Sequence, residues 1–256
     1  MKLATWNVNS VRARLERLLA WLDRHQPDVL CLQELKCTDD AFPAEPLREA
    51  GYHAAVHGQK TYNGVAILAR RDPADVRRGF PGDPDEAQAR LISAEVAGVR
   101  VFSAYVPNGR EVGSPSWEYK LEWLAALRAH LADACDANRP LAMCGDLNVA
   151  VDDRDVARPD AWADSVLCHE AARRALAGLR EVGLIDIFRK HHPEGGIYSW
   201  WDYRQLGFPR NDGLRLDHLY ATPALADRST AADVDRDERK GNKPSDHAPV
   251  VAVFGD

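Results

Sequence analysis

Polar side chains of the kinds that bind metal ions and phosphate recur in this chain beside short apolar segments. Glu34 follows one such segment, and Asp146 and Asn148 follow another. Asp246 and His247 stand just before the last one. Carboxylate and amide oxygens are ligands that Mg²⁺ takes, and histidine exchanges a proton near neutral pH. These residue types suit hydrolysis of a phosphate ester, which requires an activated water and stabilised negative charge.

Four more residues have similar positions. Asn7 ends the first apolar segment, whereas Tyr105 and Asn108 close a later one. Asp217 lies inside a strand-like segment, where aspartate is disfavoured and a buried carboxylate needs a partner. Taken singly, each residue also has a structural explanation as a turn residue, a helix cap or a core aromatic. Several of them at successive strand ends favour one shared site.

The segments that carry these side chains alternate between strand and helix patterns. Apolar residues at spacings of three and four predict a helix over residues 11–25, with Ser10 as its N-cap. Apolar runs at 2–6 and 28–32 predict strands on either side, so the chain opens with a parallel β-α-β crossover. In α/β folds, sites form where such strands end.

Similar patterns continue along the chain. Further strands are expected at 52–57, 64–69, 91–96, 99–106, 141–145, 215–221 and 248–254, and long helices at 117–134 and 169–182. Loops are expected at 107–116, 150–168 and 201–214, which are rich in Pro, Gly, Asp and Asn. The charged run 233–243 is expected to be a solvated surface loop. No linker or repeat divides the chain, so we expect residues 1–256 to form a single α/β domain with mixed sheets.

Composition limits the compartment and the partners. Of 256 residues, 45% are apolar, which is enough for one large core, and no run reaches the roughly 18 apolar residues of a membrane span. The N-terminus lacks a signal-peptide pattern and the five cysteines are scattered, so we expect a cytoplasmic protein without membrane association. A net charge of −6 argues only moderately against a nucleic-acid partner, because binding depends on one patch of the surface.

Seven stretches of the chain form a recognisable series. They are Thr5-Trp6-Asn7-Val8-Asn9-Ser10, Leu32-Gln33-Glu34-Leu35-Lys36, Asn63-Gly64-Val65-Ala66-Ile67, Tyr105-Val106-Pro107-Asn108-Gly109, Gly145-Asp146-Leu147-Asn148, Gly213-Leu214-Arg215-Leu216-Asp217-His218 and Ser245-Asp246-His247-Ala248-Pro249. In order and spacing the chain resembles the exonuclease III and abasic-site endonuclease family of the endonuclease/exonuclease/phosphatase superfamily. The resemblance implies a deoxyribonuclease-like α/β (α+β) fold, a four-layer sandwich of two packed mixed β-sheets flanked by helices, with the site at one end.

The chemistry, in agreement with the resemblance, assigns roles around a metal ion. Mg²⁺, for which Mn²⁺ can substitute, is expected to bind Glu34 first, with Asn7 and Asp246 near the ion. Asp146 would orient and deprotonate the attacking water, and Asn148 would hold that water or a phosphate oxygen, both beside the ion. The number of ions that act stays open.

Other side chains are expected to act on the phosphate itself. His247 would donate to a phosphate oxygen, with Asp217 fixing its tautomer and orientation. Tyr105 and Asn108 would contact the phosphate, and Tyr105 could also aid the leaving group.

The expectation of double-stranded DNA as the substrate rests on further residues. Lys36 lies close to the expected metal ligand and can reach a phosphate. The aromatic stretch 198–204 ends in Arg204, which can bond a phosphate, and aromatic rings can stack on bases. The resemblance favours Trp200 as a wall of the nucleotide pocket, although Trp200 and Trp201 could each be core residues. Basic residues considered for the DNA backbone also include Arg110, Lys120, Arg210 and Arg215.

These features predict a Mg²⁺-dependent DNA phosphodiesterase of base-excision repair. Its substrates would be duplexes with abasic sites or with recessed or blocked 3′ ends, and no obligate protein partner is expected. One alternative is a superfamily cousin that hydrolyses RNA or phosphoinositide phosphates. Another is an inactive nucleic-acid-binding regulator, against which the complete set of site residues argues.

Loops are expected to decide which DNA activity dominates. The segments 150–170 and 201–214 are long for a compact domain, which is typical of functional loops. An abasic nucleotide has to rotate into a pocket, and Trp162, Leu167 or His169 could fill that pocket. We therefore hypothesise that 3′-end processing outweighs abasic incision. In the alternative, Trp162 and Leu167 only anchor the loop.

Overall fold

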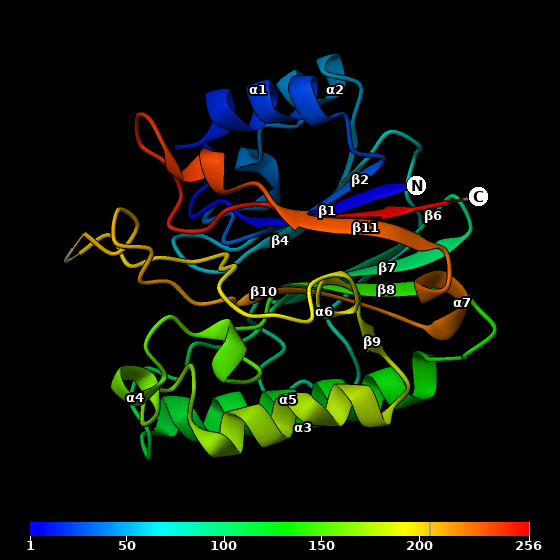
Figure 1. Ribbon diagram of the computed structural model, residues 1–256. Helices are drawn as coiled ribbons and strands as arrows, with labels where there is room; N and C mark the ends of the chain where they lie inside the picture. Colours follow the sequence, from blue (N-terminus) through cyan, green and yellow to red (C-terminus); the bar gives the residue numbers. More distant parts are fainter. Residues whose placement is uncertain (205, 256) are drawn as a thin grey trace.

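Two β-sheets pack face to face and are covered on their outer sides by helices (Figure 1). The computed structural model describes residues 1–204 and 206–255. The first sheet has the strand order β11 (Ser229–Val234), β12 (Val250–Phe254), β1 (Lys2–Asn7), β2 (Val29–Gln33), β4 (Val65–Ala69) and β3 (His53–His57). The second has the order β5 (Ala74–Arg78), β6 (Leu91–Val96), β7 (Val99–Tyr105), β8 (Leu141–Asp146), β10 (Asp217–Ala221) and β9 (Ile185–Asp186). Each sheet is mixed, because β1 and β2 run parallel, as do β7 and β8, among antiparallel neighbours.

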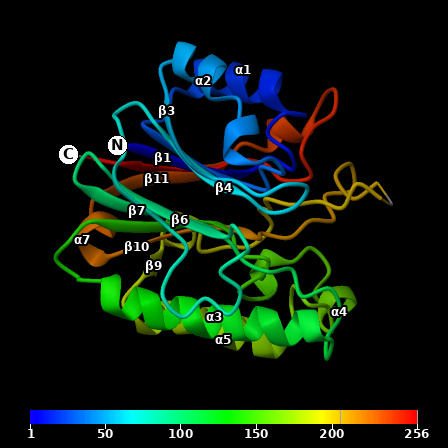
Figure 2. The ribbon, with the colours of Figure 1, turned by 180° about the vertical axis from the view of Figure 1, so that it is seen from behind.

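Helices form the two outer layers, as views from both sides show (Figures 1 and 2). The first sheet is covered by α1 (Leu15–His25) and α2 (Ala44–Glu49), and the second by α3 (Pro115–Ala134) and α5 (Glu170–Glu181). Shorter helices are α4 (Pro159–Trp162), α6 (Ile187–His191), α7 (Pro223–Ala226), η1 (Asp39–Ala41), η2 (Asp153–Asp155) and η3 (Arg236–Arg239). Apolar side chains fill the space between the sheets and the space beneath each helical layer. The expected four-layer sandwich is confirmed.

Among the helices in the described part of the chain, none has an apolar stretch that would reach across a lipid bilayer.

The first helix begins later than its apolar spacing indicates. It starts at Leu15, and residues 11–14 form a turn. Ser10 is not its N-cap, because a φ of 88° places Ser10 in a left-handed turn, where its hydroxyl accepts a hydrogen bond from the N–H of Ala13 at 3.4 Å. The helical spacing extends into this turn because Val11 packs into the same core as α1.

Two of the edge strands are absent from the sequence expectations. β5 and β11 are edge strands whose side chains are mostly exposed, so they lack the apolar runs that indicate the other strands. The expectation of a solvated loop at 233–243 is partly wrong for a related reason. Within this run, η3 buries Glu238, because Arg17 and Arg24 pair with its carboxylate.

Strand register brings polar residues from separate segments to one end of the sandwich. On neighbouring strands of the second sheet, Asp146 pairs with Tyr105 on one side and with Asp217 on the other. Asn7, at the end of β1 in the first sheet, pairs with the last residue of β2. These pairings fix which side chains can meet at the end of the sandwich.

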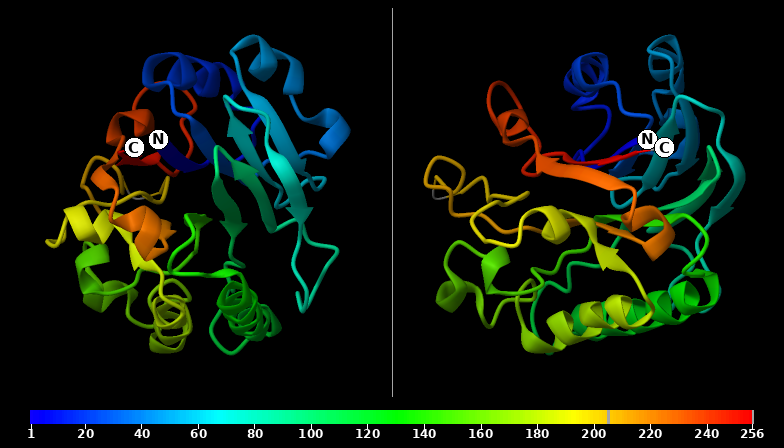
Figure 3. Two further views of the ribbon diagram at one scale, coloured as in Figure 1. Left: turned by 90° about the vertical axis from the view of Figure 1, so that its right-hand side faces the viewer. Right: turned by 45° about the vertical axis from the view of Figure 1, so that its right-hand side comes forward.

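The last strand completes the first sheet beside the first strand. β12 lies between β1 and β11, with Thr5 opposite Val250 and Lys2 opposite Val253. The two termini therefore lie side by side (Figure 3). His247 lies three residues before this strand.

A buried group of charged side chains joins the segment after β8 to β9, α6 and the start of β10. Arg215 Nε lies 2.7 Å from Asp155 Oδ1, and Arg215 Nη2 lies 2.8 Å from Asp186 Oδ2. Arg189 also pairs with Asp155. Burial alone would raise the pKa of both carboxyls, but the charge of Arg215 helps to outweigh burial, and both pKa values lie below their usual range. Arg215 is thus a core residue, and its expected DNA contact is wrong.

Arg215→Met is expected to lower the free energy of unfolding by about 3–5 kcal/mol at neutral pH, because it leaves buried carboxylates without their main cation. A carboxyl with a depressed folded-state pKa stabilises the fold above its unfolded pKa of about 4, and this contribution is lost as pH falls through the folded-state value. The difference between wild type and variant should therefore persist down to about pH 4 and shrink as the pH falls further, to about 3. Urea unfolding at neutral pH, at about pH 4 and at about pH 3 measures this difference.

The matched control is Arg158→Met, which removes a pair with Asp212 in which the arginine side chain is 57% exposed. Exposed pairs contribute about 1 kcal/mol or less. Equal losses for the two variants would contradict a stabilising role for the buried group.

Candidate active site

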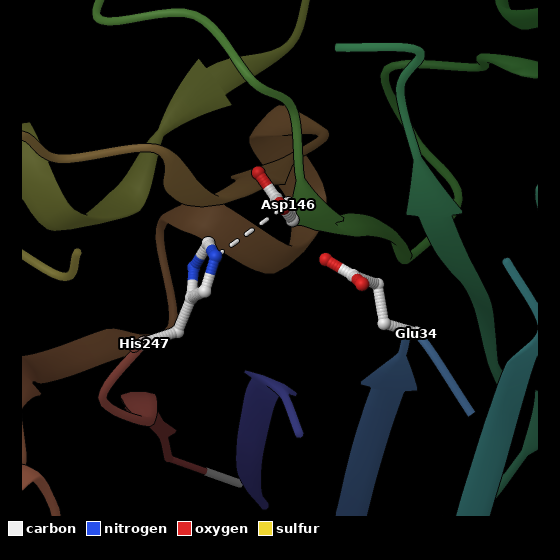
Figure 4. Close-up of side chains that lie close together, drawn as sticks. All are labelled: Glu34, Asp146 and His247. Atoms are coloured by element: carbon white, nitrogen blue, oxygen red, sulfur yellow. Dashed lines mark ion pairs between the residues drawn. The ribbon is translucent and has the colours of Figure 1, made fainter. Parts of the chain in front are cut away.

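Three side chains with metal-binding atoms converge at one end of the sandwich. Glu34 follows β2, Asp146 ends β8, and His247 precedes β12. Two carboxylate oxygens and one ring nitrogen all lie within 4.8 Å of one another, and the three side chains point toward a common space (Figure 4). Carboxylates at this spacing fit a divalent cation that prefers oxygen ligands. We call these three residues the acidic cluster.

Asn7 links the two sheets at the acidic cluster. Its Nδ2 donates to Glu34 Oε1 at 2.9 Å and to Asp146 Oδ2 at 2.9 Å. Its Oδ1 accepts a hydrogen bond from the N–H of Asn9 at 3.0 Å, which fixes the orientation of the amide. Lys36 Nζ lies 2.8 Å from Glu34 Oε2 and also donates to Asn9 Oδ1 at 2.6 Å. One amide and one ammonium therefore hold two like charges close together.

Two residues of the site have a left-handed backbone, with φ of 51° at Glu34 and 49° at Asn148. This conformation costs a residue other than glycine about 1–3 kcal/mol. Hydrogen bonds hold it at Asn148, whose N–H donates to Asp146 Oδ1 at 2.9 Å and whose Nδ2 donates to the carbonyl oxygen of Val106 at 3.0 Å. The strain lies where the chain turns away from β2 and β8, and it is part of how these side chains are positioned.

His247 and Asp217 form a buried pair beside the acids. His247 Nδ1 lies 2.8 Å from Asp217 Oδ2, and His247 Nε2 lies 3.6 Å from Asp146 Oδ2. Ser199 Oγ donates to the same Asp217 oxygen at 2.7 Å. Burial alone would lower the pKa of His247, but the charges of Asp217 and Asp146 outweigh burial and raise the pKa to about 10. The ring is therefore protonated at neutral pH.

Asp146 is buried and accepts hydrogen bonds on both carboxylate oxygens. Burial raises the pKa of Asp146, His247 lowers it in part and Asp217 raises it further, to about 7. A carboxyl with a pKa near the working pH is suited to take a proton from water. Gly145, the preceding residue, has to be glycine, because at φ 149° a Cβ would lie 1.9 Å from the carbonyl oxygen of Ala104.

Tyr105 ends β7 next to the same acids. Burial, and then the charges of Glu34 and Asp146, raise the pKa of the Tyr105 hydroxyl well above its usual value. The hydroxyl therefore stays protonated and can donate a hydrogen bond. Arg90 lies over the tyrosine ring, with 5.1 Å between its guanidinium carbon and the ring centre, and its Nη1 donates to the Tyr105 carbonyl oxygen at 3.2 Å.

Asp246 precedes His247 but does not belong to the acidic cluster. Its two oxygens accept hydrogen bonds from Asn9 Nδ2 at 2.9 Å and from Trp200 Nε1 at 3.1 Å. The carboxylate therefore orients an amide and an indole ring, and its role as a metal ligand stays a prediction.

Lys120, expected at the DNA backbone, is fully buried in α3 instead. Its Nζ donates to the carbonyl oxygens of Asn108 at 3.0 Å, Asn148 at 2.8 Å and Val166 at 2.6 Å. Burial lowers the pKa of Lys120 to about 7. All three N–H donors of its charged form are used inside the protein, so the expectation that Lys120 binds substrate is wrong.

Other residues that were expected to contact the substrate lie at the surface. Asn108 is exposed, and its Nδ2 donates to Asn148 Oδ1 at 3.1 Å. The side chain of Arg204 is 84% exposed. Trp200 is partly exposed, whereas Trp201 is fully buried between the sheets. Of the two tryptophans, Trp200 is therefore the one available to a substrate.

The bulky side chains of the 150–170 segment pack onto the protein. Trp162 contacts Trp200 edge to face, with 5.8 Å between ring centres, and Leu167 is buried beneath the second sheet. His169 Nδ1 accepts a hydrogen bond from the N–H of Ala171 at 3.2 Å and so caps α5. This packing favours the anchoring alternative for Trp162 and Leu167.

Three residues around the site are missing from the sequence expectations. Ser199 donates a hydrogen bond to Asp217. Asn9 links Lys36 to Asp246, and Arg90 lies over the ring of Tyr105. Ser199 and Asn9 both lie within segments that contain other expected site residues. A hydroxyl inside an aromatic stretch is the signal that could have indicated Ser199.

Comparison with known proteins agrees with this geometry. Residues 4–247 match the endonuclease/exonuclease/phosphatase family. Exodeoxyribonuclease III of Haemophilus influenzae is 37% identical, over 99% of this chain and 100% of its own length. An AP endonuclease from Archaeoglobus fulgidus has a TM-score of 0.96 and 42% identity, covering 99% of both chains. A 3′ phosphatase from Neisseria, solved with a product DNA hairpin, has a TM-score of 0.97 and 43% identity over 100% of this chain and 99% of its own. The chain belongs to the endonuclease/exonuclease/phosphatase family, in its exonuclease III and abasic-site endonuclease branch.

Proposed function

We propose that this chain is a Mg²⁺-dependent phosphodiesterase that cleaves duplex DNA in base-excision repair, at abasic sites and at recessed or blocked 3′ ends. The observation that carries the proposal is the meeting of Glu34, Asp146 and His247 within 4.8 Å. The relatives support DNA as the substrate, since they are named as an exodeoxyribonuclease, an AP endonuclease and a 3′ phosphatase.

The metal is proposed to bind at the acidic cluster. Glu34 would hold it first, with Asp146 and Asn7 beside it, and Asn148 and Asp246 are further candidates. When bound, Mg²⁺ neutralises negative charge on a phosphate oxygen. Mn²⁺ also accepts carboxylate and carbonyl oxygens and can substitute.

Each residue around the phosphate is proposed to have its own role in hydrolysis. Asp146 orients the attacking water and takes its proton, while the amide of Asn148 holds that water or a phosphate oxygen. His247 donates a hydrogen bond to a phosphate oxygen from Nε2, and Asp217 holds the protonated ring in orientation through Nδ1. The Tyr105 hydroxyl donates near the leaving oxygen, since its raised pKa keeps it protonated.

DNA is proposed to lie along the surface next to this cluster. A groove of about 540 Å³ beside Tyr105 and Asn108 is also lined by Arg90 and Arg110. Guanidinium groups bond phosphate oxygens, so this groove suits a nucleotide next to the scissile bond. On the other side, the ring of Trp200 offers a stacking face. Arg204 and Lys36 are the nearby cations proposed to contact the backbone.

Among the DNA activities, we hypothesise that 3′-end processing outweighs abasic incision. The 3′ phosphatase from Neisseria, with 43% identity over nearly the full length of both chains, supports activity at 3′ ends. The AP endonuclease relative, with 42% identity, keeps incision within the proposal.

One assay tests the proposed function. Labelled duplexes carry an abasic site, a recessed 3′ end or a 3′-phosphate and are incubated with Mg²⁺ or with EDTA. We expect cleavage of all three with Mg²⁺, faster at the 3′ ends, and none with EDTA. Single-stranded RNA and a phosphoinositide are run in parallel. Hydrolysis of either in preference to the duplexes, or no hydrolysis at all, would overturn the proposal.

A further inference from the structure

The buried ammonium of Lys120 bonds three separate segments, one of which directly follows Asp146. Asn108 lies in the turn after β7, Asn148 in the turn after β8, and Val166 in the segment before α5. Each offers one backbone carbonyl to Lys120 Nζ, at 3.0, 2.8 and 2.6 Å respectively. These three bonds use every donor of the ammonium.

Burying an ammonium costs free energy unless its donors are satisfied. Here the hydrogen-bond partners are neutral carbonyl oxygens, so an apolar side chain of similar size would be expected to fill the space at less cost. A lysine at this position does what an apolar residue cannot, which is to hold three backbone segments at one point. The buried lysine therefore fixes the positions of three backbone segments at the site, at a cost in the free energy of folding.

The lysine stem is as closely fixed as its end. Gly109, at φ 94°, lies against it, and a Cβ on Gly109 would lie 3.0 Å from Lys120 Cδ and 3.3 Å from the Trp117 ring. The same Cβ would lie 3.5 Å from Val166 Cβ. The turn after β7, the helix α3 and the segment before α5 are thus packed together around the lysine.

Two of the three segments carry groups of the proposed mechanism. Asn108 donates to Asn148 at 3.1 Å, and the Asn148 N–H bonds Asp146 at 2.9 Å. The third segment continues into Leu167, whose carbonyl oxygen accepts the N–H of Ala150 at 2.8 Å. A shift of the ammonium would therefore move both the phosphate contacts and the 150–170 segment.

We propose that Lys120 is a positioning residue that sets Asn108 and Asn148 against the scissile phosphate and that, by fixing the 150–170 segment, it also affects the balance of activity between abasic sites and 3′ ends. This inference rests on the proposed function. Lys120 is fully buried, so it acts through the three carbonyls and not on the phosphate itself.

The test replaces Lys120 by methionine, which has a similar length and no donor. Single-turnover rates and dissociation constants are measured on an abasic duplex and on a duplex with a recessed 3′ end. The concentration of active enzyme is determined by active-site titration, so that rates are expressed per active molecule. Because misplacement of a reacting group by about 1 Å can cost about 10²-fold, we expect the rate of Lys120→Met to fall between tenfold and 10²-fold at nearly unchanged affinity. The ratio of the two activities should change as well.

The matched control is Lys190→Met, which removes a lysine that bonds Ala226 and Ser229. A purely structural role for Lys120 would lower the active fraction and the melting temperature while leaving the rate per active molecule and the substrate ratio at the control values. That result overturns the proposal.

A second variant, Lys120→Gln, covers the case in which Lys120→Met does not fold. Its amide keeps two N–H donors, so a smaller loss of rate and a smaller change of ratio are expected. If the folded variant has the rate and substrate ratio of Lys190→Met, the proposal is likewise overturned. Failure of the wild type to cleave either duplex with Mg²⁺ would instead contradict the proposed function.

Discussion

Asp146→Asn is expected to lower the single-turnover rate of DNA cleavage by about 10²–10⁴-fold while duplex affinity stays close to the wild-type value. Asparagine keeps the shape of the side chain but cannot take a proton from the attacking water. Glu34→Gln should lose activity as well, because it removes a charge from the proposed metal site. Rates and dissociation constants are measured for each variant over a range of Mg²⁺ concentrations.

The dependence of the cleavage rate on Mg²⁺ concentration distinguishes metal binding by Glu34 from proton transfer to Asp146. Raising Mg²⁺ should restore part of the Glu34→Gln rate but little of the Asp146→Asn rate. Asp72→Asn is the control, since the side chain of Asp72 is 86% exposed. Near wild-type turnover would remove the affected residue from the site, and a loss of affinity that matches the loss of rate would assign it to DNA binding instead.

His247→Ala is expected to slow cleavage by about 10²–10³-fold, because it removes a buried, charged hydrogen-bond donor to the phosphate oxygen. The double variant with Asp217→Asn should be scarcely slower than His247→Ala alone. Asp217 acts through the ring, to which it is bonded at 2.8 Å, and residues that act as a unit are not additive. Single-turnover rates of the wild type, the two single variants and the double variant form a double-mutant cycle that measures this coupling.

Ser199→Ala extends this cycle to a residue that acts one step further away. The Ser199 hydroxyl orients Asp217, so the smaller loss of rate in Ser199→Ala should also disappear in a His247→Ala background.

If the losses of rate from Asp217→Asn and His247→Ala instead multiply in the double variant, Asp217 has an independent role, such as proton donation at the leaving oxygen.

Strand ends could be predicted from the sequence because they combine an apolar run with an abrupt change to polar residues. Glu34, Asp146 and His247 stand at such changes, and the structure brings them within 4.8 Å. The edge strands β5 and β11 could not be predicted in this way, since few of their side chains are buried and neither strand has a continuous apolar run.

Buried charge is where sequence reasoning fails for this chain. Lys120 and Arg215 have the residue type of a DNA contact, yet both are buried by partners from distant segments. Arg215 meets two aspartates, and Lys120 meets three carbonyls that no side-chain pattern can indicate. Whether a cation faces solvent or the core depends on these partners, which become neighbours only when the chain has folded.

The position of β12 has a consequence for the order of events during synthesis. β1 is synthesised well before β12, the strand with which it pairs, and His247 lies three residues before β12. Pairings between the two ends of a chain form late, because the closing of a long loop costs entropy. A nascent chain thus has both carboxylates of the acidic cluster before it has the histidine. We expect such a chain to be inactive on nearby nucleic acid until His247 and β12 have been synthesised and β12 has paired with β1.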